Sequence, residues 1–207
     1  MREFKIHKDY WSSGCDIFEK DTISISPGVT VLVGCNGAGK STLMMQLRDR
    51  LTEQKIRFLA YDNLRDGGDK ATSWAGFCGD FSKMATMIQS SEGENIVINL
   101  GNFAGRIGDF VKNTDQQEIW IFFDALDSGM SIDNIVEVKS FFEFVQKNDP
   151  EKTFYFIVSA NEYEMARGEN CFSVRDGEYV TFDDYEGFRS FILSSREAKD
   201  NRQYKER

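Results

Sequence analysis

The sequence predicts an α/β fold in which a mostly parallel sheet is flanked by helices. Its strand candidates are short apolar runs rich in β-branched and aromatic residues, which are typical of strands buried on both faces of a sheet. Stretches with helical periodicity separate these runs, and strands that alternate with helices form parallel sheets. A glycine-rich turn joins the first run to the first helix.

In the first half of the chain, a strand at residues 29–33 follows Pro27-Gly28, and a helix is expected over about residues 41–54. A second strand is expected at residues 56–61. Apolar residues then recur at helical spacing between residues 74 and 88, which is more typical of a core helix than of a cofactor contact.

A further helix is expected to begin at the capping box of Ser91 and Glu94. Its glycines each weaken it by about 1 kcal/mol relative to alanine, and close packing of another backbone would offset that cost. These glycines are Gly101, Gly105 and Gly108.

In the second half, strands are predicted at residues 119–123 and 153–158, with a helix over about residues 131–147 between them. Residues 171–182 predict a hairpin, and a closing helix follows Asp183.

No linker or internal repeat interrupts the chain, so we expect a single domain over residues 1–207 with a helical insertion at about residues 70–113. The net charge of −9 argues against broad, nonspecific binding of nucleic acid, although it leaves room for a local basic patch. The four cysteines form no C-x-x-C pair and no signal peptide is evident, which predicts a reduced, cytoplasmic protein. No apolar run approaches the roughly 20 residues that span a bilayer, so we expect no membrane insertion.

The most specific motif is Gly34-Cys-Asn-Gly-Ala-Gly-Lys-Ser41, which fits the phosphate-binding loop G-x-x-x-x-G-K-[ST]. It lies between a predicted strand and a predicted helix, as the motif requires. Glycines let backbone N–H groups turn toward phosphates, and the helix N-terminus adds the positive end of its dipole. We therefore expect a P-loop NTPase fold that binds a nucleoside triphosphate, ATP with Mg²⁺, with Lys40 on the phosphates and Ser41 on the metal. The expected binding set is Gly34, Asn36, Gly37, Gly39, Lys40, Ser41 and Thr42.

With Pro27-Gly28, the following strand and G-C-N-G-A-G-K-S-T-L, the chain resembles the ATP-binding-cassette class of P-loop ATPases. The resemblance implies that Asp124, at the end of its apolar strand, binds Mg²⁺. It also implies that the Ser91-Glu-Gly-Glu94 segment acts as a signature-like helix start, where Ser91 meets the nucleotide held by a partner copy.

The chain departs from that class at positions that matter for hydrolysis. Ala125 stands where a glutamate normally polarises the attacking water, which leaves Asp127 as the next carboxylate and the candidate general base. Asn161 stands where the class usually has a histidine. We therefore predict secure nucleotide binding and slow hydrolysis that involves Asp124, Asp127 and Asn161.

Two further positions are candidates for the nucleotide and its metal. Tyr10 and Trp11 lie upstream of the loop, where the class often stacks an aromatic ring on adenine; burial of these rings in the first sheet is the alternative. Asn63 follows the second strand and is a candidate ligand for Mg²⁺ or water, with an ordinary turn residue as the alternative.

The resemblance implies a protein that forms an ATP-dependent homodimer, like the heads of recombination, repair and chromosome-maintenance ATPases or small phage P-loop proteins. Such a protein would act as a switch in a DNA-related or defence-related process. A protein or DNA would be its partner, although the net charge of −9 does not support this partner. The alternatives are the nucleotide-binding subunit of a transporter and a small-molecule or nucleotide kinase. A kinase would need an arginine-bearing lid, for which Arg65 and Arg106 are the candidates beyond the first helix. Outside the enzymes, an ATP-gated binding module that barely hydrolyses also fits these residues.

Overall fold

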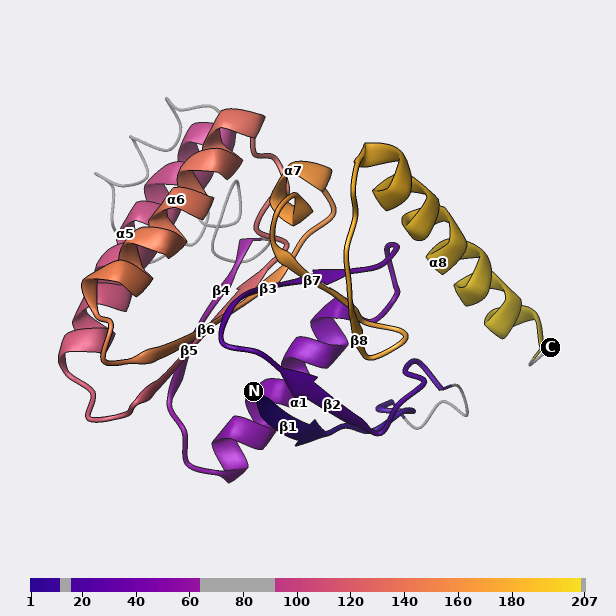
Figure 1. Cartoon of the computed structure of the whole chain (residues 1–207), viewed down its shortest axis with the longest axis horizontal. Coiled ribbons are helices and arrows are strands. Elements are labelled where there is room, and N and C mark those ends of the chain that lie inside the picture. Colours follow the sequence, from indigo (N-terminus) through magenta and orange to yellow (C-terminus); the bar gives the residue numbers. More distant parts are fainter. Residues whose placement is uncertain (12–15, 64–91, 206–207) are drawn as a thin grey trace, which may run out of the picture.

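A computed structural model describes residues 1–11, 16–63 and 92–205 of the chain (Figure 1). At its centre lies a six-stranded sheet with the order β4-β5-β6-β3-β7-β8. All neighbouring strands are parallel except β7 and β8, which are antiparallel. The strands are β3 (Gly28–Val33), β4 (Phe58–Asp62), β5 (Glu118–Asp124), β6 (Thr153–Ser159), β7 (Asn170–Ser173) and β8 (Glu178–Val180).

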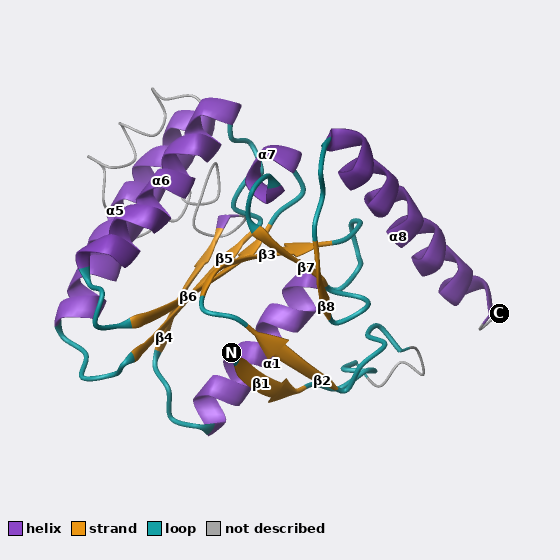
Figure 2. Cartoon of the chain, in the orientation of Figure 1, coloured by secondary structure: helices purple, strands orange, loops and turns teal. Residues whose placement is uncertain are grey.

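Helices cover both faces of this sheet, so the predicted fold class is confirmed (Figure 2). On one face, α5 and α6 pack side by side; on the other lies α1, beside a small antiparallel sheet of β1 and β2. The helices are α1 (Lys40–Glu53), α5 (Glu92–Lys112), α6 (Ile132–Asn148), α7 (Tyr163–Ala166) and α8 (Tyr185–Lys205).

Strand β5 shows why the predicted strands are continuously apolar. Ile119, Ile121 and Phe123 face the core formed with α5 and α6, whereas Trp120 and Phe122 face the core formed with α1. Successive side chains of a strand point to opposite faces, and here both faces are covered. All of these side chains are buried, so no polar position interrupts the run.

The small sheet of β1 (Arg2–Lys5) and β2 (Thr22–Ile25) was not predicted from the sequence. Its strands are only four residues long, and each alternates exposed and buried positions over too short a distance to form a clear pattern. Phe4, Ile23 and Ile25 are buried in the core beneath α1, so the sheet closes that side of the molecule.

The expected start of the second strand at residue 56 was wrong by two residues. Lys55 adopts a left-handed backbone conformation with φ 58°, and the Ile56 N–H donates to the Leu51 carbonyl oxygen at 2.9 Å. These residues therefore complete the end of α1, and β4 begins at Phe58.

The C-terminal part of the fold matches the predicted hairpin and closing helix. Strands β7 and β8 pair in antiparallel register, with Gly177 at φ 67° in the turn between them. Among the described helices, none is both long enough and apolar enough to cross a bilayer.

Candidate functional site

The glycine loop, Asp124 and Asn161 meet where β3, β5 and β6 end at the same edge of the sheet. Because β6 lies between β3 and β5, its end reaches the middle of this edge. A cavity of about 480 Å³ opens there. It is lined by Asn36, Gly37, Gly39, Lys40, Ser41 and Thr42, by Asp124, Ala125, Ser159 and Asn161, and by Trp11 and Ile17.

The glycine loop between β3 and α1 uses backbone conformations that L side chains rarely adopt. Gly37 has φ 78°, and Gly39, the N-cap of α1, has φ 101°. A Cβ on Gly39 would lie only 2.6 Å from Ile17 Cγ2. The loop therefore needs glycine at this position both for its backbone conformation and for its fit against the preceding segment.

Lys40 lies at the bottom of the loop. Its ammonium group donates to the carbonyl oxygens of Gly34 at 2.8 Å and Cys35 at 3.3 Å. Burial lowers the pKa of Lys40, while the neighbouring side chains of Cys35, Asp127 and Asp124 act in the opposite direction. A phosphate in the cavity would stabilise the charged ammonium group further, because a nearby opposite charge favours the ionised form.

Ser41 and Asp124 meet although they are 83 residues apart in the sequence. Ser41 Oγ donates to Asp124 Oδ1 at 3.1 Å, and Ser159 Oγ donates to the same oxygen at 2.5 Å. Mg²⁺ prefers oxygen ligands and is usually held by one or two carboxylates together with substrate phosphates. The Ser41–Asp124 pair, next to a phosphate-binding loop, fits that requirement.

Ala125 directly follows β5 in a left-handed conformation with φ 51°. Its N–H donates to Ser159 Oγ at 2.8 Å, and its carbonyl accepts from Asn63 Nδ2 at 3.2 Å. Asn63 Nδ2 also donates to the Ser128 carbonyl at 2.8 Å, and the Asn63 side chain is buried. The structure thus places Asn63 where its amide holds the loop after β5, and outside the described cavity lining.

The Asp127 side chain is 2% exposed and joins the loop after β5 to the loop after β6. Its Oδ2 accepts the backbone N–H groups of Asn161 and Glu162, each at 2.6 Å. Burial raises the pKa of Asp127, and these two hydrogen bonds oppose that shift. Among the described residues, Asn161 lines the cavity and Asp127 does not.

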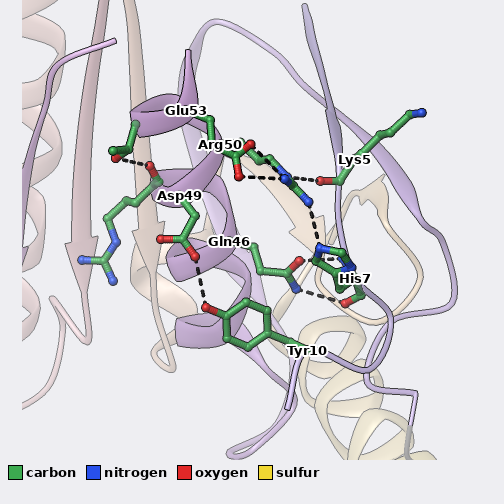
Figure 3. Close-up of polar contacts among 9 residues, drawn as sticks. Lys5, His7, Tyr10, Gln46, Asp49, Arg50 and Glu53 are labelled. Carbon is green, nitrogen blue, oxygen red and sulfur yellow. Dashed lines mark hydrogen bonds and ion pairs between the residues drawn. The ribbon is translucent and has the colours of Figure 1, made fainter. Parts of the chain in front are cut away.

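The N-terminal segment that carries Tyr10 is fastened to the outer side of α1 (Figure 3). His7 and Gln46 exchange two hydrogen bonds, at 2.6 and 3.1 Å, and Tyr10 OH donates to Asp49 Oδ2 at 3.0 Å. Trp11 packs edge-to-face on Tyr10 and lines the cavity. The structure therefore places Trp11 in the cavity wall, with Tyr10 behind it; Ser91, the other expected nucleotide contact, lies outside the described residues.

Sequence reasoning missed three side chains at this site. Ser159 orders Asp124, and it could have been found from the end of the β6 strand once that strand was placed beside β5. Ser195 and Lys199 of α8 contact the glycine loop from outside, and no pattern in the sequence indicates this contact.

Comparisons with known proteins give matches among solved structures and none by sequence. No family model matches the chain, and no curated protein matches it in sequence. Among solved structures, a nucleotide-free ATP-binding cassette from an ABC transporter aligns with a TM-score of 0.46 and 13% sequence identity. The alignment covers 89% of this chain and 91% of the cassette. Because the identity and the TM-score are low, the function is inferred from the chain's own residues.

Proposed function

We propose that this protein binds Mg·ATP at the carboxyl edge of its parallel sheet. The observation that carries the proposal is the meeting of Ser41 and Asp124 beside Lys40, in a cavity walled by the glycine loop. A nucleoside triphosphate offers the anionic oxygens that such a loop and a lysine bind. Mg²⁺ would be held by Ser41 and Asp124 with the phosphates, and it would neutralise phosphate charge.

Stacking on the nucleotide base is assigned to the ring of Trp11. Trp11 is 59% exposed and lines the same cavity as the glycine loop, so its ring is accessible to a base bound there. The edge-to-face contact with Tyr10, which is itself anchored on Asp49, restricts where the Trp11 ring can lie.

Hydrolysis is proposed to be slow. Among the described residues that line the cavity, Asp124 carries the one carboxylate, and it is already bonded to Ser41 and Ser159. Ala125 has no group that can take a proton from water. The proposed role of Asp127 is to position Asn161, because its carboxylate accepts the backbone N–H groups of residues 161 and 162.

ATP binding is proposed to drive homodimerisation of the chain. The dimer would act as a switch in a DNA-related or defence-related process. This part follows from the resemblance of the sequence to cassette ATPases. For the kinase alternative, Arg106 is the described candidate for a lid arginine. Its guanidinium lies over the Phe103 ring on α5 at 5.1 Å, and Arg106 is not among the described residues that line the cavity.

Calorimetric titration of the chain and of Lys40→Ala with Mg·ATP tests the binding proposal. Removing a charge-assisted contact to a buried phosphate costs about 2–5 kcal/mol, so we expect binding to be lost or weakened at least thirtyfold. Lys147→Ala, which removes an exposed charge paired with Glu143 on α6, is the matched control and keeps the affinity. Equal affinity in the chain and in Lys40→Ala would overturn the assignment of the loop.

A further inference from the structure

The C-terminal helix α8 lies against the outside of the glycine loop (Figure 1). Ser195 Oγ accepts the Cys35 N–H at 3.2 Å, and Lys199 Nζ donates to the Asn36 carbonyl at 3.0 Å. The approach is close along the loop: a Cβ on Gly37 would lie 3.5 Å from Lys199 Nζ. Two side chains one helical turn apart therefore bind consecutive loop residues.

The contact is part of the buried face of α8. Phe188 is buried in the core beneath the helix, and Ser195, two turns further along, is also buried. A buried backbone N–H without a partner is costly, and the Ser195 hydroxyl satisfies the Cys35 N–H at a place where no strand or helix does so. Ser195 therefore has a specific partner, the Cys35 N–H, on the buried face of α8.

The ties made by α8 differ in kind from those made by Lys40. Lys40 bonds to the carbonyls of Gly34 and Cys35, and these bonds compete with a phosphate for the same ammonium group. The hydrogen bonds from the Cys35 N–H to Ser195 Oγ and from Lys199 Nζ to the Asn36 carbonyl involve no atom of Lys40, so they do not depend on where its ammonium group points.

We propose that Ser195 and Lys199 are positioning residues that hold the glycine loop in its phosphate-accepting shape through α8. This inference rests on the proposed nucleotide function. A loop that is already ordered loses less conformational entropy when a ligand binds, so these two hydrogen bonds increase the affinity for nucleotide. By linkage, bound nucleotide also strengthens the docking of α8, which couples the C-terminal helix to the state of the site.

The test uses Ser195→Ala and Lys199→Gln in the full chain, with Arg196→Gln as the matched control. Arg196 is on the same helix with a 72% exposed side chain, so its variant changes the same charge away from the loop. Two quantities are measured: Mg·ATP affinity by calorimetry, and the rate at which Cys35 is alkylated without nucleotide, resolved by mass spectrometry. Cys171 is the internal control for global opening, because it is buried and burial raises the pKa of its thiol to about 11.

We expect each α8 variant to weaken Mg·ATP binding roughly three- to tenfold, as for the loss of one hydrogen bond, and to speed alkylation of Cys35 with Cys171 still protected. Arg196→Gln should change neither quantity. The inference is overturned if both α8 variants match Arg196→Gln while the unaltered chain binds Mg·ATP. If the unaltered chain does not bind, the proposed function fails instead. Faster alkylation of Cys171 together with Cys35 would show that a variant unfolds globally. The decision then rests on Lys199→Gln, because the bond from Lys199 to the loop is exposed. If Lys199→Gln does not speed the alkylation of Cys35 alone, the inference is overturned.

Discussion

The Asp127 carboxylate is enclosed by protein between two loops of the site. Oδ2 accepts two backbone N–H groups, while Oδ1 is buried and has no hydrogen-bond partner among the described residues. A charged oxygen in that position is costly, and this burial raises the pKa of the group above its usual value.

Asp127→Asn should therefore change how stability depends on pH. A carboxyl whose folded-state pKa is raised contributes stability that is fully present below its unfolded pKa, near 3.9, and that is lost as pH rises through the folded value. The variant lacks this titration. We expect the stability difference between variant and unaltered chain to shift in the variant's favour from pH 4 to pH 7, measured by urea unfolding at each pH.

The exposed Asp115 provides the control for that experiment, since Asp115→Asn makes the same chemical change without the burial. A pH-independent difference between Asp127→Asn and the unaltered chain would contradict the assignment of a buried, desolvated carboxylate.

At the scale of the elements, α5 carries glycines whose expected packing is not present in the described part of the chain. A Cβ built on Gly101, Gly105 or Gly108 meets no described atom within 4 Å. In the exposed interior of a helix, glycine lowers stability by about 0.5–1 kcal/mol relative to alanine because it loses more backbone conformational entropy on folding.

Gly105→Ala should therefore raise the free energy of unfolding by about 0.5–1 kcal/mol. Gly39→Ala makes the same substitution where φ is 101° and Ile17 is 2.6 Å from the added carbon, so it should lower stability. Chemical denaturation of both variants checks the opposite signs. If Gly105→Ala is also destabilising, another backbone does approach α5 at this glycine.

The elements also show what sequence patterns can and cannot predict. Buried parallel strands such as β5 are recognisable because both of their faces are apolar, whereas β1, β2 and α7 are too short to carry a period. The glycine loop and Asp124 were recognisable from local motifs. Ser195 and Lys199 were not, because their roles depend on which helix the fold brings beside the loop. Ser159 becomes recognisable only once β6 is placed beside β5.

At the scale of the whole molecule, we predict that Mg·ATP converts the 23.7 kDa monomer to a species of roughly twice that mass. The expectation comes from the signature-like segment Ser91–Glu94, of which Glu92–Glu94 begin α5 and Ser91 lies outside the described residues. Light scattering with a slowly hydrolysed ATP analogue measures the change, and Ser91→Arg, which would place a bulky side chain against the partner's nucleotide, should prevent it. A chain that stays monomeric at every concentration would remove the switch mechanism and favour the kinase alternative.

The most direct test of the central claim is the magnesium dependence of ATP affinity in the chain and in Asp124→Asn. The asparagine oxygen still accepts the hydrogen bonds from Ser41 and Ser159, so the fold is kept while the charge facing the metal is lost. We expect Mg²⁺ to tighten ATP binding by at least about tenfold in the unaltered chain and to have little effect in the variant. Equal tightening in both proteins, or no ATP binding by the unaltered chain with Mg²⁺, would contradict a nucleotide site built from the glycine loop and the end of β5.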